Sequence, residues 1–198
     1  VIIEHDGKSV KQTSFSTISA AAKICKEVEV LILGSNTSQL VSNLKKTDLI
    51  SKVNFVDDKS LSHQIAENLS VIVKSFLEKN DFTHVLLPSS TFGKNLGPKI
   101  ATILDVQQIS DIIEVFDHET FSRPIYAGNA ISKIKSRDNI KVITVRPTCF
   151  EPCAQNSNVS DEKFDISQSQ TDKVEFVDYD QSESDRPELT SAKIVISG

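Results

Sequence analysis

The 198-residue chain has 38% hydrophobic and 25% charged residues, a composition typical of one ordinary folded domain with a tail. No run approaches the roughly 18 consecutive apolar residues that a membrane helix needs, so we expect no membrane insertion. Residues 1–150 hold 18 Lys/Arg against 16 Asp/Glu, whereas residues 151–198 hold 4 against 11. A near-neutral body with an acidic C-terminal segment argues against nucleic acid as a partner.

Strand-like and helix-like runs alternate regularly up to residue 105. The clearest helix has apolar residues every three or four positions from Leu61 to Phe76, with Asp58 or Ser60 as its possible N-cap. The remaining predicted strands are 1–4, 28–33, 52–56 and 83–87, and the remaining helices are 14–26, 38–46 and 93–104. Alternation of this length predicts right-handed crossovers and an open, parallel, Rossmann-like α/β sheet.

The pattern changes after residue 105. Strand-like runs at 111–115, 121–127, 131–134 and 141–145 leave no room for helices between them. Gly128-Asn129 is a plausible hairpin turn, because Gly and Asn adopt left-handed backbone conformations at low cost. We therefore expect added strands after residue 110 that extend the sheet or form an antiparallel edge.

The C-terminal part is rich in Ser, Gln, Asn and Asp from residue 151 onward. This composition predicts an extended, partly mobile connector over 151–190, in which only 174–177 is strand-like. Residues 191–198 (SAKIVISG) look like a buried strand that reaches a glycine. In α/β domains such a strand leads into a glycine loop and a helix whose N-terminus holds phosphate, which we expect to lie beyond Gly198.

The loop at 89–95 follows a strand and opens a helix, the context in which anions bind. It does not match a Walker A loop, because proline replaces the first glycine and Asn95 replaces the Ser/Thr. One interpretation is a phosphate or partner contact. The interpretation that we favour is an N-capping turn, with Ser90 or Thr91 as the cap and Gly93 allowing close packing.

Glu4–Gly7 (EHDG) ends the first strand at the edge where this fold class binds ligands. His5, between two carboxylates, could act as an acid or base, but no nucleophile accompanies it, and we favour a solvated loop. Arg146, at another strand end, could bind a carboxylate bidentately, or could cap a strand or dock the connector.

The other histidines and the cysteines form no recognisable metal or nucleophile set. No two of the histidines have metal-ligand spacing: His63, His84 and His118. An odd number of cysteines in a chain of this size favours reduced thiols: Cys25, Cys149 and Cys153. We therefore predict no catalytic residue, no metal ligand and no cofactor-binding residue within the chain.

Several long, ordered stretches nevertheless resemble one family, the alpha subunits of electron transfer flavoproteins. The stretches are 4–7 (EHDG), 83–95 (THVLLPSSTFGKN), 107–112 (QQISDI), 120–130 (TFSRPIYAGNA), 141–147 (KVITVRP) and 185–198 (DRPELTSAKIVISG). The resemblance implies an adenine nucleotide alpha hydrolase-like version of the Rossmann-like sheet. It also implies an N-terminal α/β domain at 1–150, an acidic connector at 151–185, and at 186–198 the start of a C-terminal FAD-binding domain.

This resemblance implies an electron carrier and not an enzyme. Its expected partner is a beta subunit in a heterodimer, with acyl-CoA dehydrogenases and a quinone oxidoreductase binding transiently during fatty acid oxidation. FAD would be bound by residues beyond Gly198, so no cofactor residue is assigned here. The implied compartment is the mitochondrial matrix in a eukaryote or the cytoplasm in a bacterium.

Two alternatives remain at this stage. One is a stand-alone nucleotide-binding α/β module with its ligand at 4–7 and 89–95. The other is an adenylating or hydrolytic enzyme on a similar fold, which fits less well because no serine/glycine phosphate loop follows the first strand.

Overall fold

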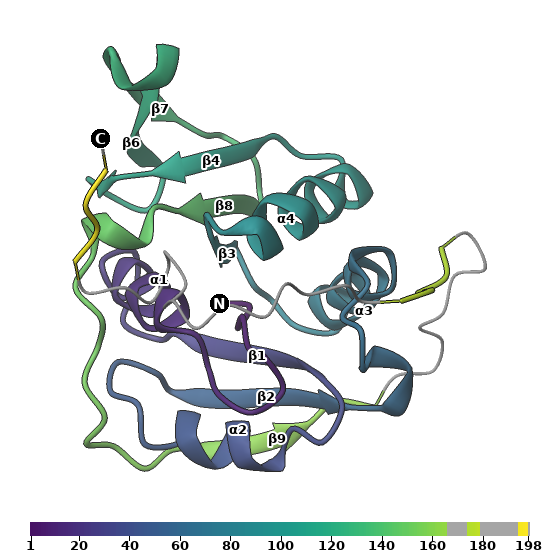
Figure 1. Ribbon diagram of the computed structural model, residues 1–198. Helices are drawn as coiled ribbons and strands as arrows, with labels where there is room; N and C mark the ends of the chain where they lie inside the picture. The colour runs from purple at the N-terminus through teal and green to yellow at the C-terminus, as the bar shows by residue number, and fades with distance from the viewer. Residues whose placement is uncertain (166–173, 179–193, 198) are drawn as a thin grey trace.

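A parallel β-sheet runs through the centre of the molecule (Figure 1). The structure, a computed structural model, describes residues 1–165, 174–178 and 194–197. Its helices are α1 (Gln12–Ala22), α2 (Ser38–Leu44), α3 (Ala66–Glu78) and α4 (Thr91–Leu104), with short 3-10 turns η1 (Lys59–Leu61), η2 (Tyr126–Gly128) and η3 (Pro147–Cys149). Its strands are β1 (Glu29–Gly34), β2 (Lys52–Asp57), β3 (His84–Pro88), β4 (Gln108–Ile112), β5 (Glu114–Val115), β6 (Thr120–Ile125), β7 (Ala130–Lys135), β8 (Lys141–Val145) and β9 (Ser160–Lys163).

The N-terminal residues join two groups of parallel strands into one sheet. One group has the order β1-β2-β9 and the other β3-β8-β4. Between them, the Ile3 amide donates to the Leu31 carbonyl at 3.0 Å and the Ile2 amide donates to the Leu86 carbonyl at 2.9 Å. The predicted strand at 1–4 is thus reduced to a bridge between Ile2 and Leu31, placed at the middle of the sheet. The open, mostly parallel α/β fold is confirmed.

Alternating residues of the central strands face two separate apolar clusters. In β1, Val30 and Ile32 pack with the buried residues of α1 and α2, whereas Leu31 and Leu33 pack with those of α3 and α4. Helices therefore cover both faces of the sheet, as βαβ crossovers require. This double cover leaves the ends of the strands as the places where loops can form a site.

The predicted helix from Leu61 to Phe76 is interrupted near its start. Asp58 caps η1 by accepting from the Ser60 amide at 2.8 Å, and Gln64 then adopts a left-handed φ of 48°. The helix α3 begins only at Ala66. The predicted apolar face is confirmed, because Leu61 and Leu69 share one buried cluster. The prediction of one continuous helix across residues 61–66 was wrong.

The added strands after residue 110 form an antiparallel ribbon, β5-β6-β7. At the turn, φ is positive at Tyr126, Ala127 and Gly128, whereas Asn129 has a right-handed φ of −68°. The left-handed prediction was therefore right for Gly128 and wrong for Asn129. The predicted strand at 111–115 is divided, because β4 ends at Ile112 and β5 begins at Glu114. Asp111, with a φ of 61°, lies where the register of β4 with β8 shifts.

The connector differs most from expectation. Residues 160–163 form β9, which pairs in parallel with β2, so the stretch up to residue 165 is attached to the domain. The described residues 174–177 and 194–197 are not strands, and Ile194 and Ile196 are exposed. A buried strand needs paired neighbours, and no described strand pairs with these residues. The rest of the predicted connector and terminal strand, 166–173, 179–193 and 198, lies outside the described residues.

Candidate functional site

The carboxyl ends of the parallel strands bring together most of the residues that the sequence singled out. We call this region the carboxyl edge and define it as residues 4–9, 34–37, 57–64, 89–93, 111 and 146. It includes the EHDG loop, the turn before α4 and Arg146, which come from distant parts of the sequence. In open α/β sheets this is the edge at which ligands bind.

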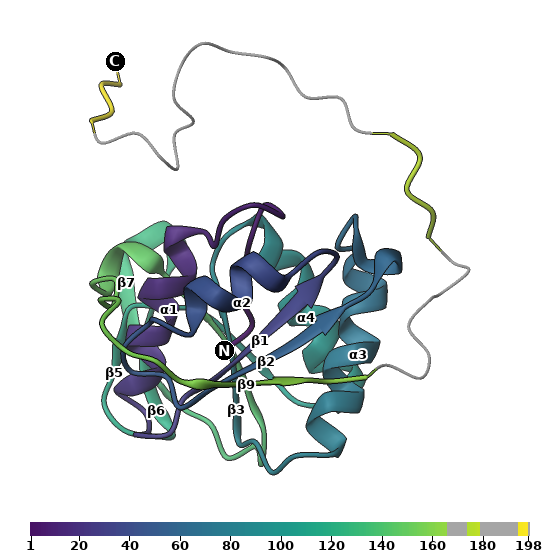
Figure 2. The same cartoon turned by 90° about the horizontal axis from the view of Figure 1, so that it is seen from below.

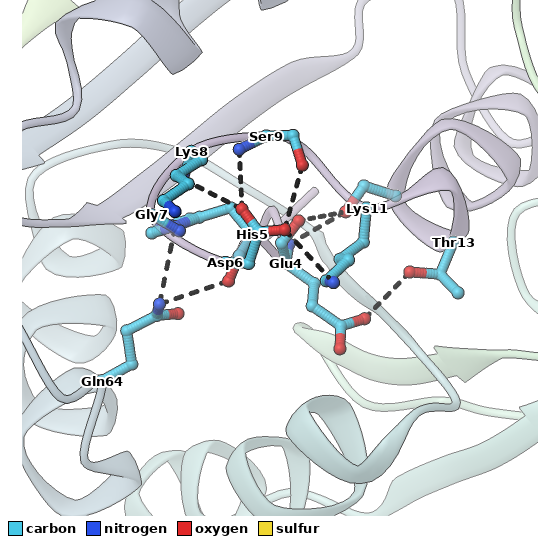
Figure 3. Close-up of polar contacts among 10 residues, drawn as sticks. Glu4, His5, Asp6, Gly7, Lys8, Ser9, Lys11, Thr13 and Gln64 are labelled. Carbon is cyan, nitrogen blue, oxygen red and sulfur yellow. Dashed lines mark hydrogen bonds and ion pairs between the residues drawn. The ribbon is translucent and has the colours of Figure 1, made fainter. Parts of the chain in front are cut away.

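His5 is buried at the carboxyl edge, with only 6% of its surface exposed, so the expectation of a solvated side chain was wrong. Its Nε2 lies 3.0 Å from the Leu33 carbonyl. Its Nδ1 accepts from the Gly7 amide at 3.1 Å, in the loop shown in Figure 3. Gln64 Nε2 donates to the His5 carbonyl at 3.3 Å. Because Nδ1 is an acceptor and Nε2 faces a carbonyl, the contacts fit neutral imidazole with its hydrogen on Nε2.

The electrostatics of His5 agree with this tautomer. Burial lowers the pKa of His5, and this effect outweighs the Leu33 hydrogen bond and the nearby Asp6 and Glu4 carboxylates, which act to raise it. Both ring nitrogens are engaged with the protein's own groups. His5 therefore fastens the EHDG loop to the end of β1 and is not placed to exchange protons with a substrate.

The two carboxylates beside His5 also bond to the protein's own groups, Asp6 within the loop and Glu4 to the start of α1 (Figure 3). Asp6 accepts from the amides of Ser9 at 2.7 Å and Lys8 at 2.9 Å, and these bonds hold its pKa below the usual range. Glu4 Oε2 accepts from the Thr13 hydroxyl at 2.9 Å. Gly7 makes the turn with a φ of 83°, a conformation that glycine adopts without strain. The loop thus satisfies its own polar groups.

Asp57 occupies the place where related folds bind phosphate. Its carboxylate accepts from the backbone amides of Asn36 at 2.8 Å and Thr37 at 3.0 Å, just before α2. In dinucleotide-binding βαβ units, amides at this position hold the pyrophosphate. Here the protein's own carboxylate is the anion. Asp57 was not among the predicted site residues; its position at the end of a buried strand is its only signal in the sequence.

The turn before α4 is an N-cap, which confirms the favoured interpretation of 89–95. The Ser90 hydroxyl accepts from the Gly93 amide at 3.3 Å. Gly93 is required for close packing, since a Cβ at this position would lie 1.8 Å from the Pro88 carbonyl oxygen. The amide that a phosphate would use at this helix start is therefore bonded to Ser90.

Arg146 does bind a carboxylate, and that carboxylate belongs to the same chain. Its Nε lies 3.2 Å and 3.1 Å from the two oxygens of Asp111, and its Nη2 also bonds to Asp111. Burial raises the pKa of Asp111, but the opposing contribution of Arg146 prevails and the pKa lies below its ordinary value. The ion pair joins the ends of β4 and β8.

A hollow of about 550 Å³ remains open beside this edge, between α1 and the stretch after β8. Hydroxyl groups from Thr13, Ser16 and Thr148 line it, together with Glu151. No described Lys or Arg lines the hollow, and Glu151 disfavours a phosphate there. The hollow does not provide an evident anion site.

Of the other histidines, His63 belongs to the carboxyl edge, whereas His84 is at the opposite end of β3. His84 Nε2 lies 2.6 Å from the His118 carbonyl, and the His63 ring stacks on Phe176 at 3.7 Å. All three cysteines are free thiols: Cys25, Cys149 and Cys153. Over the described ranges, no three His, Cys, Asp or Glu residues are arranged to hold a metal ion. No helix in the same ranges has the length and apolar character to cross a bilayer.

Comparison with known proteins identifies the family of the chain. Residues 1–184 match the family model described as "Electron transfer flavoprotein domain". The chain belongs to the electron transfer flavoprotein family. Curated relatives agree with this assignment over the full length of the chain.

Three relatives show the extent of the similarity. The "Electron transfer flavoprotein subunit alpha" of Pseudomonas aeruginosa is 40% identical over 198 residues, which are 100% of this chain and 63% of the relative. The "Electron transfer flavoprotein subunit alpha, mitochondrial" of Dictyostelium discoideum is 38% identical, and the "Probable electron transfer flavoprotein subunit alpha, mitochondrial" of Caenorhabditis elegans is 34% identical. Each of these two matches covers 100% of this chain and 60% of the relative. The chain thus spans about three-fifths of the length of these electron transfer flavoprotein subunits.

The family name raises the question of whether the described residues fit a flavin dinucleotide. The amides of Asn36 and Thr37 are bonded to Asp57, and the Gly93 amide is bonded to Ser90. A pyrophosphate at the carboxyl edge would have to displace these internal bonds. The described residues of this electron transfer flavoprotein domain therefore do not fit FAD at this edge.

Proposed function

We propose that this chain is part of the alpha subunit of a heterodimeric electron transfer flavoprotein, and that its α/β domain serves as scaffold and subunit interface. The complete carrier would take electrons from acyl-CoA and other dehydrogenases and pass them to the respiratory chain through a quinone oxidoreductase. The observation that carries the scaffold role is that His5, Asp57 and Arg146 are all bonded to the domain's own groups. These three side chains therefore support the domain's own structure and are not free to bind a ligand.

We further propose the domain division that follows from this role. Residues 1–150 are the N-terminal α/β domain, 151–185 an acidic connector whose first part is attached to the domain through β9, and 186–198 the start of the FAD-binding domain. The flavin would then be held outside the described residues. The compartment would be the mitochondrial matrix in a eukaryote, as the names of two relatives suggest, or the cytoplasm in a bacterium.

Exposed apolar side chains on the antiparallel ribbon support an interface role. Tyr126 is 80% exposed at the tip of the ribbon, and Ile131 and Phe116 are exposed on the same ribbon. Apolar side chains that form one contiguous exposed patch mark surfaces that bind a partner, and we propose that these three contribute to such a patch. The beta subunit is the partner that the family assignment suggests.

Capture by the beta subunit tests this proposal. An immobilised beta subunit should retain this 198-residue chain at micromolar concentration, and Ile131→Asp should weaken retention at least about tenfold. The matched control is Leu49→Asp, which changes an exposed leucine on a different part of the surface. Failure of the unmodified chain to bind would overturn the interface role, and equal loss in both variants would place the interface elsewhere.

Ligand binding separates the proposal from a nucleotide-binding module. The purified chain should be colourless, and AMP or ATP should not raise its melting temperature. A ligand that binds the native state at a hundred times its Kd adds about 2.7 kcal/mol to the free energy of unfolding. A shift of several degrees with AMP would favour the nucleotide-binding module, and stoichiometric flavin in the preparation would contradict the scaffold role.

A further inference from the structure

Residues 154–164, which we call the strap, run along one side of the domain after the chain leaves β8 (Figure 2). The strap first follows the end of α2, where the Ser157 amide donates to the Lys46 carbonyl at 2.8 Å and the Val159 amide to the Lys45 carbonyl at 3.0 Å. It then forms β9 beside β2, with Lys52 opposite Ser160 and Phe55 opposite Lys163. The β9 part of the strap is therefore the outermost strand on this side of the sheet.

Polar contacts at the surface hold most of the strap. All side chains of β9 are exposed, so this strand buries no apolar side chain of its own. Lys45 pairs with Asp161 at 2.6 Å, and Lys52 pairs with Glu162. Ion pairs in such positions contribute little, because water and salt replace them at small cost.

A single aromatic side chain anchors the far end of the strap. Phe164 meets the Phe76 ring edge-on at 5.2 Å, and Lys79 Nζ lies 4.8 Å from the Phe164 ring centre. The Phe164 amide donates to the Phe55 carbonyl at 2.8 Å. Beyond this anchor, Asp165 is exposed. The strap thus combines a weak polar ladder with two apolar contacts, Phe164 at its far end and the partly buried Val159 before β9.

We propose that the strap is a detachable edge strand, which leaves β2 and α2 as a unit while the rest of the domain stays folded. The central strands have buried side chains on both faces, so their opening requires global unfolding, whereas the strap can open by losing surface contacts. Attached, the strap fixes Asp165 near the end of α3. Detached, its roughly 11 residues at about 3.3 Å each lengthen the tether by up to about 35 Å.

The use of this device rests on the proposed function. A carrier whose flavin domain follows the connector needs that domain to reach a partner, and tether length sets the reach. Detachment itself is a property of this chain and does not depend on the beta subunit. The two ideas therefore fail separately.

Native-state hydrogen exchange tests detachment on this 198-residue chain. The amides of Val159 and Phe164 should exchange at least about 100-fold faster, relative to their intrinsic rates, than the Leu31 amide in the centre of the sheet. Raising the salt from about 0.02 M to about 0.5 M should speed the strap amides several-fold, because the ion pairs are screened. Equal protection of strap and centre would overturn the proposal.

Paired variants locate the effect. Phe164→Ala should speed exchange of the Val159 amide at least about tenfold and leave the Leu31 amide unchanged. Phe116→Ala is the control, since Phe116 also has a lysine ammonium over its ring but is exposed, in the distant ribbon. Two outcomes would show that the strap does not open as a separate unit. One is that Phe116→Ala speeds amide exchange in the strap as much as Phe164→Ala does. The other is that Phe164→Ala speeds exchange of the Leu31 amide as much as that of the Val159 amide. Loss of beta-subunit capture with these exchange results intact would refute only the proposed function.

Discussion

The carboxyl edge and the strap use the same kinds of contact with opposite consequences. At the carboxyl edge, His5 and Asp57 bond to backbone groups of neighbouring strands and turns. In the strap, Asp161 and Glu162 pair with lysines at the surface. His5 is 6% exposed, whereas the Glu162 side chain is 62% exposed. Burial, and not the number of contacts, decides what each region contributes.

The physical reason lies in what replaces a lost contact. When a surface ion pair opens, water solvates both charges, so the net loss is small. When a buried hydrogen bond is removed, its partner is left without water and the full desolvation cost appears. The buried contacts of His5 should therefore be lost only when the whole domain unfolds, and the strap should respond locally.

The largest change in stability that would test this difference between the two regions is expected at Gly93, the tightest contact of the carboxyl edge. Gly93→Ala places a Cβ 1.8 Å from the Pro88 carbonyl oxygen, so the turn before α4 must move. We expect a loss of about 3 kcal/mol or more in the free energy of unfolding, measured by urea denaturation. Gly128→Ala is the control: its φ of 90° disfavours alanine, but nothing lies within 4 Å, so about 1 kcal/mol is expected. Similar losses for both would show that the contact at Gly93 relaxes easily.

The next largest effect concerns His5. His5→Ala removes the partners of the Leu33 carbonyl and the Gly7 amide and leaves a cavity. We expect the free energy of unfolding to fall by about 2–3 kcal/mol. His118→Ala is the matched control, since that side chain is 68% exposed, and should change the same quantity by less than about 0.5 kcal/mol. A small effect at His5 would contradict the importance that we assign to burial at the carboxyl edge.

Much of the carboxyl edge could be located from the sequence, but the state of its residues could not. The strand periodicity placed His5, Ser90 and Arg146 at strand ends, and the structure brings them to one edge. That His5 is buried depends on Leu33 and Gln64, which are 28 and 59 residues away. Such distant contacts leave no local pattern, and the sequence therefore suggested solvent.

The strand in the strap could not be predicted, because its sequence lacks the pattern of a buried strand. Residues 160–163 (SDEK) have no apolar alternation, because a strand at the edge with exposed side chains does not need one. Composition alone therefore indicated a mobile connector. The interruption at Gln64 had the same origin, since its left-handed backbone is accompanied by a long-range bond to the His5 carbonyl.

A smaller effect is expected in the pH dependence of stability. Burial lowers the folded-state pKa of His5, so the unfolded chain binds a proton more readily. Stability from the neutral form is present above the unfolded value of about 6.5 and is lost as the pH falls toward the lowered folded value. The pKa of His84 is lowered as well, so His84 also contributes to the pH dependence of wild-type stability. A His5→Gln variant keeps His84, and comparison of its pH profile with that of the wild type isolates the contribution of His5. Between about pH 6.5 and 5, we expect the wild-type stability to fall more steeply, by at most about 1.4 kcal/mol per pH unit. Parallel pH profiles would contradict a buried neutral His5.

The smallest expected effect belongs to the strap. Glu162→Gln removes the charge that pairs with Lys52 but keeps the shape of the side chain. Because the pair is at the surface, the global free energy of unfolding should change by less than about 1 kcal/mol, measured by urea denaturation. The exchange rate of the Val159 amide should nevertheless depend less on salt, because the Lys52–Glu162 ion pair, which salt weakens in the wild type, is absent from the variant. Lys74→Ala, which opens an exposed pair with Glu78 on α3, is the control and should leave the strap unchanged. If Glu162→Gln lowers global stability as much as His5→Ala, the strap belongs to the cooperative core, and the contrast between the two regions is wrong.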